Sequence, residues 1–189
     1  MKNIAILASG KGSNANNICN YFHNHPLVKV TAIISDRKEA GVFQVAKKHQ
    51  IESLYINKAE WLQPHQLIAF LKEKNIDLIV LAGFLKLIPT ELIIAFPGKI
   101  INIHPALLPK YGGKGMYGHF VHEAVHAAGE KETGITIHYV DEHYDEGDII
   151  FQATTTLNNG DDADIIAARI HQLEMKHFPA VIERILLPS

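Results

Sequence analysis

The 189-residue chain contains a single cysteine, lacks long hydrophobic runs and carries almost no net charge. Cys19 alone allows neither an internal disulfide nor a zinc site built on a cysteine pair. The apolar runs are far shorter than a membrane span, and the brief apolar N-terminus does not resemble a secretory signal. We therefore expect a cytoplasmic protein with no membrane contact.

The 18 basic and 20 acidic residues give a formal charge of -2, which offers no electrostatic surface for nucleic acid. An anionic ligand must then be bound by a local group of donors. Most of the 12 histidines stand singly, and His119, His122 and His126 are expected on solvated helix surfaces, with no metal site. The composition, 47% hydrophobic and 20% charged, is typical of a globular domain, and we expect one domain over residues 1–189.

Strand and helix patterns alternate along the first half of the chain, which predicts an α/β fold with a doubly wound, mostly parallel sheet. The second half predicts a helix, two antiparallel strands and a long final helix. Strands are expected at 3–7, 28–35, 53–56, 78–82, 99–104, 134–140 and 149–157. Helices are expected at about 14–22, 42–49, 64–74, 90–96 and 120–128, and from Asp161 or Asp162 to Ile185.

The end of the strand at 99–104 carries the most informative residues. Asn102 and His104 lie two positions apart between isoleucines, so both side chains project from one face of a buried strand. Pro105 ends the strand, at the sheet edge where open α/β folds bind their ligands. An amide donor beside an imidazole that titrates near neutrality suits chemistry at a carbonyl group.

An acidic segment at 141–148 can bring a carboxylate to that imidazole. Its candidates are Asp141, Asp145, Glu146 and Asp148, and periodicity alone does not choose among them. A carboxylate there would complete an Asn/His/Asp arrangement, although loops of this composition are usually just solvated.

Three loops are candidates for ligand binding. Residues 9–14 (SGKGSN) join the first strand to the first helix, where glycines and free helix amides favour a phosphate or carboxylate over a simple turn capped by Ser13 or Asn14. Residues 81–89 (LAGFLKLIP) either line a slot for a flat ring or form an ordinary connection. Residues 107–115 form either a cover over the site or a disordered surface loop.

Four segments occur in the order found in the formyltransferases that use 10-formyltetrahydrofolate, and the chain resembles this family along its whole length. They are residues 9–14, 81–84 (LAGF), 102–105 (NIHP) followed by 107–109 (LLP), and 134–145. The branch that serves purine synthesis is the most similar. The resemblance implies a Rossmann-like formyltransferase fold, with phosphate binding in residues 1 to about 100 and folate binding and catalysis in about 101 to 189.

Several residue roles follow only from this resemblance. It implies that Asn102, His104 and Asp145 are catalytic. It further implies that the phosphate and ribose of the acceptor are bound by Gly12, Ser13, Asn14 and Glu174. The residues it implies for folate binding are Phe84, Leu85, Lys86, Leu87, Ile88, Val140, Asp141 and Tyr144. Lys11, Lys86 and the glycine-rich stretch 112–118 depart from the family pattern.

The expected reaction is transfer of the formyl group from 10-formyltetrahydrofolate to the amine of glycinamide ribonucleotide in de novo purine biosynthesis. It needs no metal and no enzyme-bound intermediate, and the protein would be a monomer or a homodimer. We expect neither a tRNA enzyme nor a formylfolate hydrolase, because those relatives carry additional domains. An amino-sugar formyltransferase is the alternative among enzymes, and a non-catalytic nucleotide-binding module is the alternative outside them.

Overall fold

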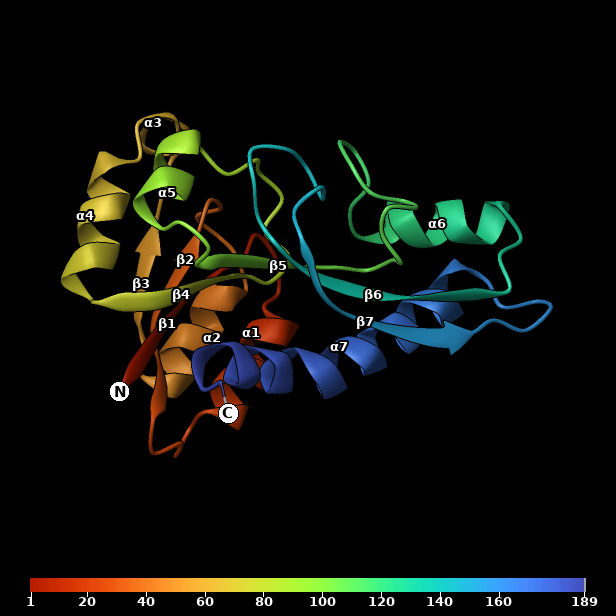
Figure 1. Ribbon diagram of the computed structural model, residues 1–189, viewed down its shortest axis with the longest axis horizontal. Coiled ribbons are helices and arrows are strands. Elements are labelled where there is room, and N and C mark those ends of the chain that lie inside the picture. The colour runs from red at the N-terminus through yellow and green to blue at the C-terminus, as the bar shows by residue number, and fades with distance from the viewer. Residues whose placement is uncertain (189) are drawn as a thin grey trace.

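The computed structural model describes residues 1–188, in which seven strands form one sheet in the order β3-β2-β1-β4-β5-β6-β7 (Figure 1). Strands β1 to β5 pair in parallel, and β6 is antiparallel to both β5 and β7. The predicted fold class is confirmed. The strands are β1 (Lys2–Leu7), β2 (Val28–Ser35), β3 (Glu52–Tyr55), β4 (Ile76–Leu81), β5 (Ile100–His104), β6 (Glu132–Tyr139) and β7 (Ile149–Thr156).

Two hydrophobic cores lie on the two faces of the sheet. One core packs α1, α2, α6 and α7 against the sheet, and the other packs α3, α4 and α5. This division is that of a doubly wound sheet, in which buried parallel strands are covered on both faces. The helices are α1 (Ser13–Tyr21), α2 (Val42–His49), α3 (Lys58–Leu62), α4 (His65–Glu73), α5 (Thr90–Ala95), α6 (His119–Ala127) and α7 (Ala163–Leu186).

The expected elements are present within two residues of their predicted ends, and α3 is the element that the prediction missed. Asn57 and Glu60 form a reciprocal capping box at its start. Asp162 is the residue that caps α7, by accepting a hydrogen bond from the backbone of Ile165. Gly12 occupies the N-cap position of α1 and has no side chain to donate or accept, so the less favoured alternative of a turn capped by Ser13 or Asn14 is not found. The first-turn amides of α1 are therefore left without a side-chain cap.

The site is positioned where the strand order reverses. The chain runs outward from β1 to β2 and β3, then returns to add β4 on the other side of β1. The loops that follow β1 and β4 meet there, and the backbone N–H of Ser9 donates to the carbonyl of Gly83 at 3.0 Å. Such a reversal leaves a crevice at the carboxyl ends of the strands. Among residues 1–188, no helix is long and apolar enough to cross a bilayer.

Candidate active site

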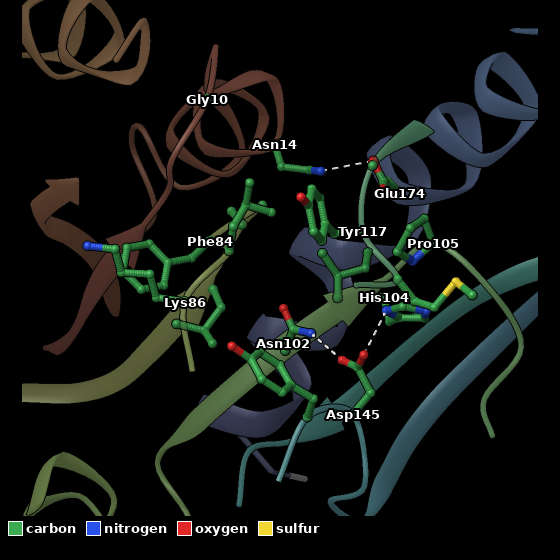
Figure 2. Close-up of a pocket in the computed structure, with 18 of the residues that line it drawn as sticks. Gly10, Asn14, Phe84, Lys86, Asn102, His104, Pro105, Tyr117, Asp145 and Glu174 are labelled. Carbon is green, nitrogen blue, oxygen red and sulfur yellow. Dashed lines mark hydrogen bonds and ion pairs between the residues drawn. The ribbon is translucent and has the colours of Figure 1, made fainter. Parts of the chain in front are cut away.

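One cavity of about 620 Å³ lies along the carboxyl ends of β1, β4 and β5. It is lined by residues of all three candidate ligand-binding loops and by the strand end that carries Asn102 and His104. Its walls include the glycine loop (residues 10–14), the ring loop (residues 84–88), the end of β5, the cover segment (residues 113–118) and Glu174 of α7. Figure 2 shows Asn14 and Glu174 at one end of this space and Asn102, His104 and Asp145 at the other.

Asn102, His104 and Asp145 come together at the end of β5. The Nδ2 atom of Asn102 lies 3.4 Å from Oδ1 of Asp145, and Nδ1 of His104 lies 3.4 Å from Oδ2 (Figure 2). One carboxylate is therefore straddled by an amide and an imidazole on the same strand face. Distances of this length are common in ligand-free catalytic sites, where contacts shorten once substrate is bound.

Local backbone conformation aims the carboxylate of Asp145 at its partners. Asp145 has φ of 60°, a left-handed conformation that is uncommon for residues other than glycine. Its Oδ2 atom also accepts the backbone N–H of Gly113 at 3.0 Å. Of the rival acids, Asp141 accepts the backbone N–H of His143 instead, which serves the turn itself. Strained conformations of this kind concentrate at functional sites.

Burial and neighbouring charges set the ionisation of this group. Burial is the largest influence on His104 and lowers its pKa below the usual value, although the charge of Asp145 and the carbonyl of Tyr111 oppose it. Burial acts to raise the pKa of Asp145, but the hydrogen bond to His138 and the charge of His104 outweigh it, so the pKa is lowered. Asp145 is therefore an ionised acceptor at neutral pH.

His138 of β6 completes the group and was not identified from the sequence. It is opposite Asn102 in the β5–β6 ladder, and its Nε2 atom lies 3.1 Å from the Asn102 amide and 3.5 Å from Asp145. The strand Ile135-Thr136-Ile137-His138 alternates apolar and polar residues, which would have placed His138 on the polar face. We call Asn102, His104, His138 and Asp145 the polar cluster.

His122 was expected on a solvated helix surface, and this expectation is wrong. It lies in α6 with 7% of its surface exposed, lines the cavity, and its Nδ1 atom has no hydrogen-bond partner. Burial, followed by the nearby charges of His119 and His104, lowers its pKa to about 4. The residue is thus a neutral imidazole on the wall of the cavity. Among residues 1–188, no group of three or more His, Cys, Asp or Glu side chains has a metal-binding arrangement.

The predicted phosphate and ribose residues, Gly12, Ser13, Asn14 and Glu174, line the opposite end of the cavity. Asn14 donates a hydrogen bond of 2.9 Å to Oε2 of Glu174, which joins α1 to α7 (Figure 2). The Oδ1 atom of Asn14 is buried without a partner. Burial raises the pKa of Glu174, and the hydrogen bond from Asn14 only partly offsets this effect. This end therefore contains uncapped helix amides, an orphan acceptor and a buried carboxyl group.

Of the predicted folate-binding residues, seven line the cavity and one does not. The seven are Phe84, Leu85, Lys86, Leu87, Ile88, Val140 and Tyr144. Asp141 is absent from the walls, because its carboxylate points into its own turn and accepts the backbone N–H of His143. Two hydrogen bonds hold the ring loop in place, since the Leu85 N–H donates to Ser9 and the Leu87 N–H donates to the Tyr144 hydroxyl.

A family model described as formyl transferase matches residues 2–182. The chain belongs to the formyl transferase family, and the resemblance predicted from the sequence is confirmed.

Within that family, the chain is similar to phosphoribosylglycinamide formyltransferases. The Bacillus subtilis (strain 168) protein is 38% identical over 98% of this chain and 95% of its own length. The chloroplastic protein of Vigna unguiculata is 41% identical over 96% of this chain. The chain spans 60% of that plant protein and 64% of the Arabidopsis thaliana one. A solved glycinamide ribonucleotide transformylase 1 from Geobacillus kaustophilus superposes with a TM-score of 0.90 at 33% identity, covering 99% of this chain and 100% of the other.

Proposed function

We propose that this protein transfers the formyl group of 10-formyltetrahydrofolate to the amine of glycinamide ribonucleotide. The observation that carries the proposal is one continuous cavity, which has the uncapped N-terminus of α1 at one end, the buried polar cluster at the other and the apolar ring loop beside it. An acceptor with a phosphate at one end and an amine at the other would span that length. The relatives' names agree with this substrate.

The acceptor nucleotide would bind with its phosphate on the backbone of the glycine loop. The amides of the first turn of α1 have no side-chain cap, and the helix dipole favours an anion at this point. Glu174 would accept hydrogen bonds from the ribose hydroxyls, in place of the bond that it now receives from Asn14. These contacts would direct the amine toward the polar cluster.

The folate would lie against the ring loop. Phe84 and Ile88 are buried there and pack with Trp61, so the wall is apolar and fixed, while backbone groups remain to bind ring heteroatoms. Tyr144 and Val140 close the other side of this wall. A planar pteridine held in this way would present its formyl group to Asn102 and His104. The fit rests on these apolar walls and on the backbone groups of the ring loop other than the Leu85 and Leu87 N–H, which donate within the protein.

In the reaction, the amine nitrogen attacks the formyl carbon and the formyl oxygen becomes an oxyanion. Asn102 Nδ2 and a protonated His104 would donate to that oxygen, and one such donor contributes about 3 kcal/mol or more. Asp145 would accept the proton from the attacking amine and return it, directly or through water, to the departing folate N10. The bond from the formyl carbon to N10 breaks, which leaves a formamide and tetrahydrofolate.

The test is a formyl-transfer assay with purified protein, 10-formyltetrahydrofolate and glycinamide ribonucleotide, followed by the absorbance of the deformylated folate. We expect transfer that depends on the nucleotide and is abolished in His104→Ala. Folate deformylation without the nucleotide would instead identify a hydrolase. Folate binding without transfer to the nucleotide would contradict the proposal, and transfer to an amino sugar would then support the alternative enzyme.

A further inference from the structure

The backbone just ahead of the cover segment contacts the imidazole of His104. Gly113, the first residue of that segment, contacts the carboxylate of Asp145. The carbonyl of Tyr111 lies 2.7 Å from Nε2 of His104, on the opposite side of the ring from Asp145. Two residues later, the N–H of Gly113 donates to Asp145 at 3.0 Å. A stretch of three residues therefore holds the outer nitrogen of the imidazole and one oxygen of the carboxylate.

Tyr111 is in turn anchored at its other end. Its hydroxyl donates to Oε1 of Glu130 at 2.8 Å, and Lys110 donates to the same oxygen at 2.9 Å. Glu130 lies between α6 and β6, outside the cavity walls. Hydrogen bonds from Lys110 and Tyr111 hold the pKa of Glu130 below its usual value, so it is a carboxylate. Tyr111 has φ of 57°, a conformation that a residue with a side chain adopts only when its surroundings hold it.

We propose that Tyr111 and Glu130 form a tether that positions His104 for the reaction: Glu130 fixes the Tyr111 side chain, and the Tyr111 carbonyl fixes the imidazole. Both are positioning residues, because neither is placed to touch the reacting atoms. This inference rests on the proposed function for its catalytic meaning. Whether Glu130, outside the cavity, controls the ionisation of His104 can be measured without substrate.

The tether selects which nitrogen of His104 does the chemistry. The Tyr111 carbonyl and the Asp145 carboxylate both accept hydrogen bonds, and the contact of 2.7 Å at Nε2 is shorter than that of 3.4 Å at Nδ1, so the proton of the neutral imidazole is drawn to Nε2. Nδ1 is then the nitrogen left facing Asp145. When the ring is protonated, the new N–H forms at Nδ1, on the side of the Asp145 carboxylate that also accepts from Asn102. Without the tether, the neutral ring can carry its proton on either nitrogen and can rotate.

The tether also favours the charged imidazole. The groups that face His104 are Asp145, the Tyr111 carbonyl, His138 from β6 and His122 from α6. Burial and the charge of His138 lower the pKa of His104, whereas Asp145 and the Tyr111 carbonyl raise it. A weaker contact with the Tyr111 carbonyl therefore moves the pKa of His104 further down. The protonated imidazole of His104 is then populated only at lower pH.

The test compares Tyr111→Phe, Glu130→Ala and Glu130→Gln with wild type. Tyr111→Phe keeps the ring that packs on the core and removes only the hydroxyl. Glu130→Gln retains an oxygen that accepts from Tyr111, whereas Glu130→Ala does not. Lys110→Met is the matched control, because it removes the other donor to Glu130 and leaves the Tyr111 contact intact. The readouts are kcat, KM for both substrates, and the NMR titration of His104, assigned by the resonances lost in His104→Ala.

We expect Tyr111→Phe and Glu130→Ala to lower kcat about tenfold with KM changed by less than about twofold, because a misplaced catalytic group costs rate more than binding. The His104 titration should move to lower pH in both. Glu130→Gln and Lys110→Met should stay near wild type. An unchanged His104 titration in both variants would overturn the tether, even if heat stability fell.

A shifted titration with wild-type kcat would overturn the positioning role. If the wild type transfers no formyl group to the nucleotide, the proposed function fails. The titration still decides whether the tether controls His104.

Discussion

At the glycine loop, the groups that face the cavity belong mainly to the backbone, whereas at the polar cluster they are buried side chains. Gly12 has no side chain and begins α1 with φ of 83°, and Gly10 and Lys11 are exposed. At the other end, His104 and His138 are 3% and 2% exposed, and each bonds to a named partner. The groups presented at the glycine loop depend on the path of the backbone, and those presented at the polar cluster depend on which side chains are there.

The two ends should therefore fail in different ways when they are mutated. A change of side chain should matter little at the glycine loop unless it alters the backbone. At the polar cluster, an isosteric change that leaves the backbone untouched should remove the chemistry. Four substitutions test this contrast, and they are arranged from the largest expected effect to the smallest.

The largest effect is expected for Asp145→Asn, which preserves shape and removes the charge. Asparagine cannot take the proton of the amine and cannot stabilise a charged His104. We expect kcat to fall about 10²- to 10⁴-fold, with the dissociation constant for folate unchanged. Rapid-quench kinetics and fluorescence titration of the folate would measure the two quantities. An equal loss of binding and turnover would assign Asp145 a structural role and weaken the contrast.

At the glycine loop, Gly12→Ala should be the most damaging change. A Cβ atom at Gly12 would lie 2.8 Å from Cγ2 and 3.0 Å from the backbone Cα of Val42, and the positive φ adds strain. We expect the free energy of unfolding to fall by about 2–4 kcal/mol. The affinity for the nucleotide should fall with it. Gly10→Ala is the control, since a Cβ there meets nothing within 4 Å. Equal behaviour of the two variants in urea unfolding would contradict the expected clash at Val42.

The same contrast explains how much the sequence could predict. Alternating periodicity located the strands and helices because buried faces must be apolar, and it placed Asn102 and His104 together on one face of their strand. Asn57 and Glu60, three residues apart, carried a capping box that would have revealed α3. The alternation around His138 was likewise readable, although a polar strand residue by itself does not reveal its neighbour across the sheet.

Other features of the site depended on tertiary structure. Periodicity could not distinguish Asp145 from Asp141, because the turn that separates their roles is set by long-range contacts such as that with Gly113. The resemblance selected Asp145, and the geometry places it beside His104. His122 was assigned to a solvated surface because helix position alone does not show that the residue is buried on the wall of the cavity. The Tyr111–Glu130 contact joins residues 19 apart and has no sequence pattern.

A smaller effect is expected for Glu174→Gln. Glu174 presents a side chain, but it does so at the end of the cavity where the glycine loop presents mainly backbone groups. The glutamine can still accept from Asn14, but it binds ribose hydroxyls less strongly than a carboxylate. We expect KM for the nucleotide to rise about tenfold with kcat nearly unchanged. Steady-state kinetics with the nucleotide varied would measure this, and an unchanged KM would remove Glu174 from the ribose site.

Glu174 also makes stability depend on pH. Burial raises its pKa above the usual value, so the folded state binds this proton more tightly than the unfolded state does. The group therefore favours folding below its unfolded pKa, and that contribution is lost as pH rises through the folded pKa. Above the folded pKa the charged, buried carboxylate opposes folding, so Glu174→Gln should gain melting temperature relative to wild type as pH rises through that pKa. The difference should disappear at low pH, and a variant that loses melting temperature relative to wild type as pH rises would contradict the assignment.

The smallest effect is expected for Lys11→Asn, which replaces the charged side chain of the glycine loop with a short polar one. Lys11 is exposed and lines the cavity, so its charge can attract a phosphate through water. An exposed charge pair contributes about 1 kcal/mol or less and is screened over about 8 Å at physiological salt. We expect KM for the nucleotide to rise at most about threefold, and the difference from wild type to vanish as salt is raised to about 1 M. If the backbone amides of the glycine loop bind the phosphate, the site should still bind it without Lys11. A loss of about a hundredfold, insensitive to salt, would mean that the lysine itself holds the phosphate, and the two ends of the cavity would then depend equally on side chains.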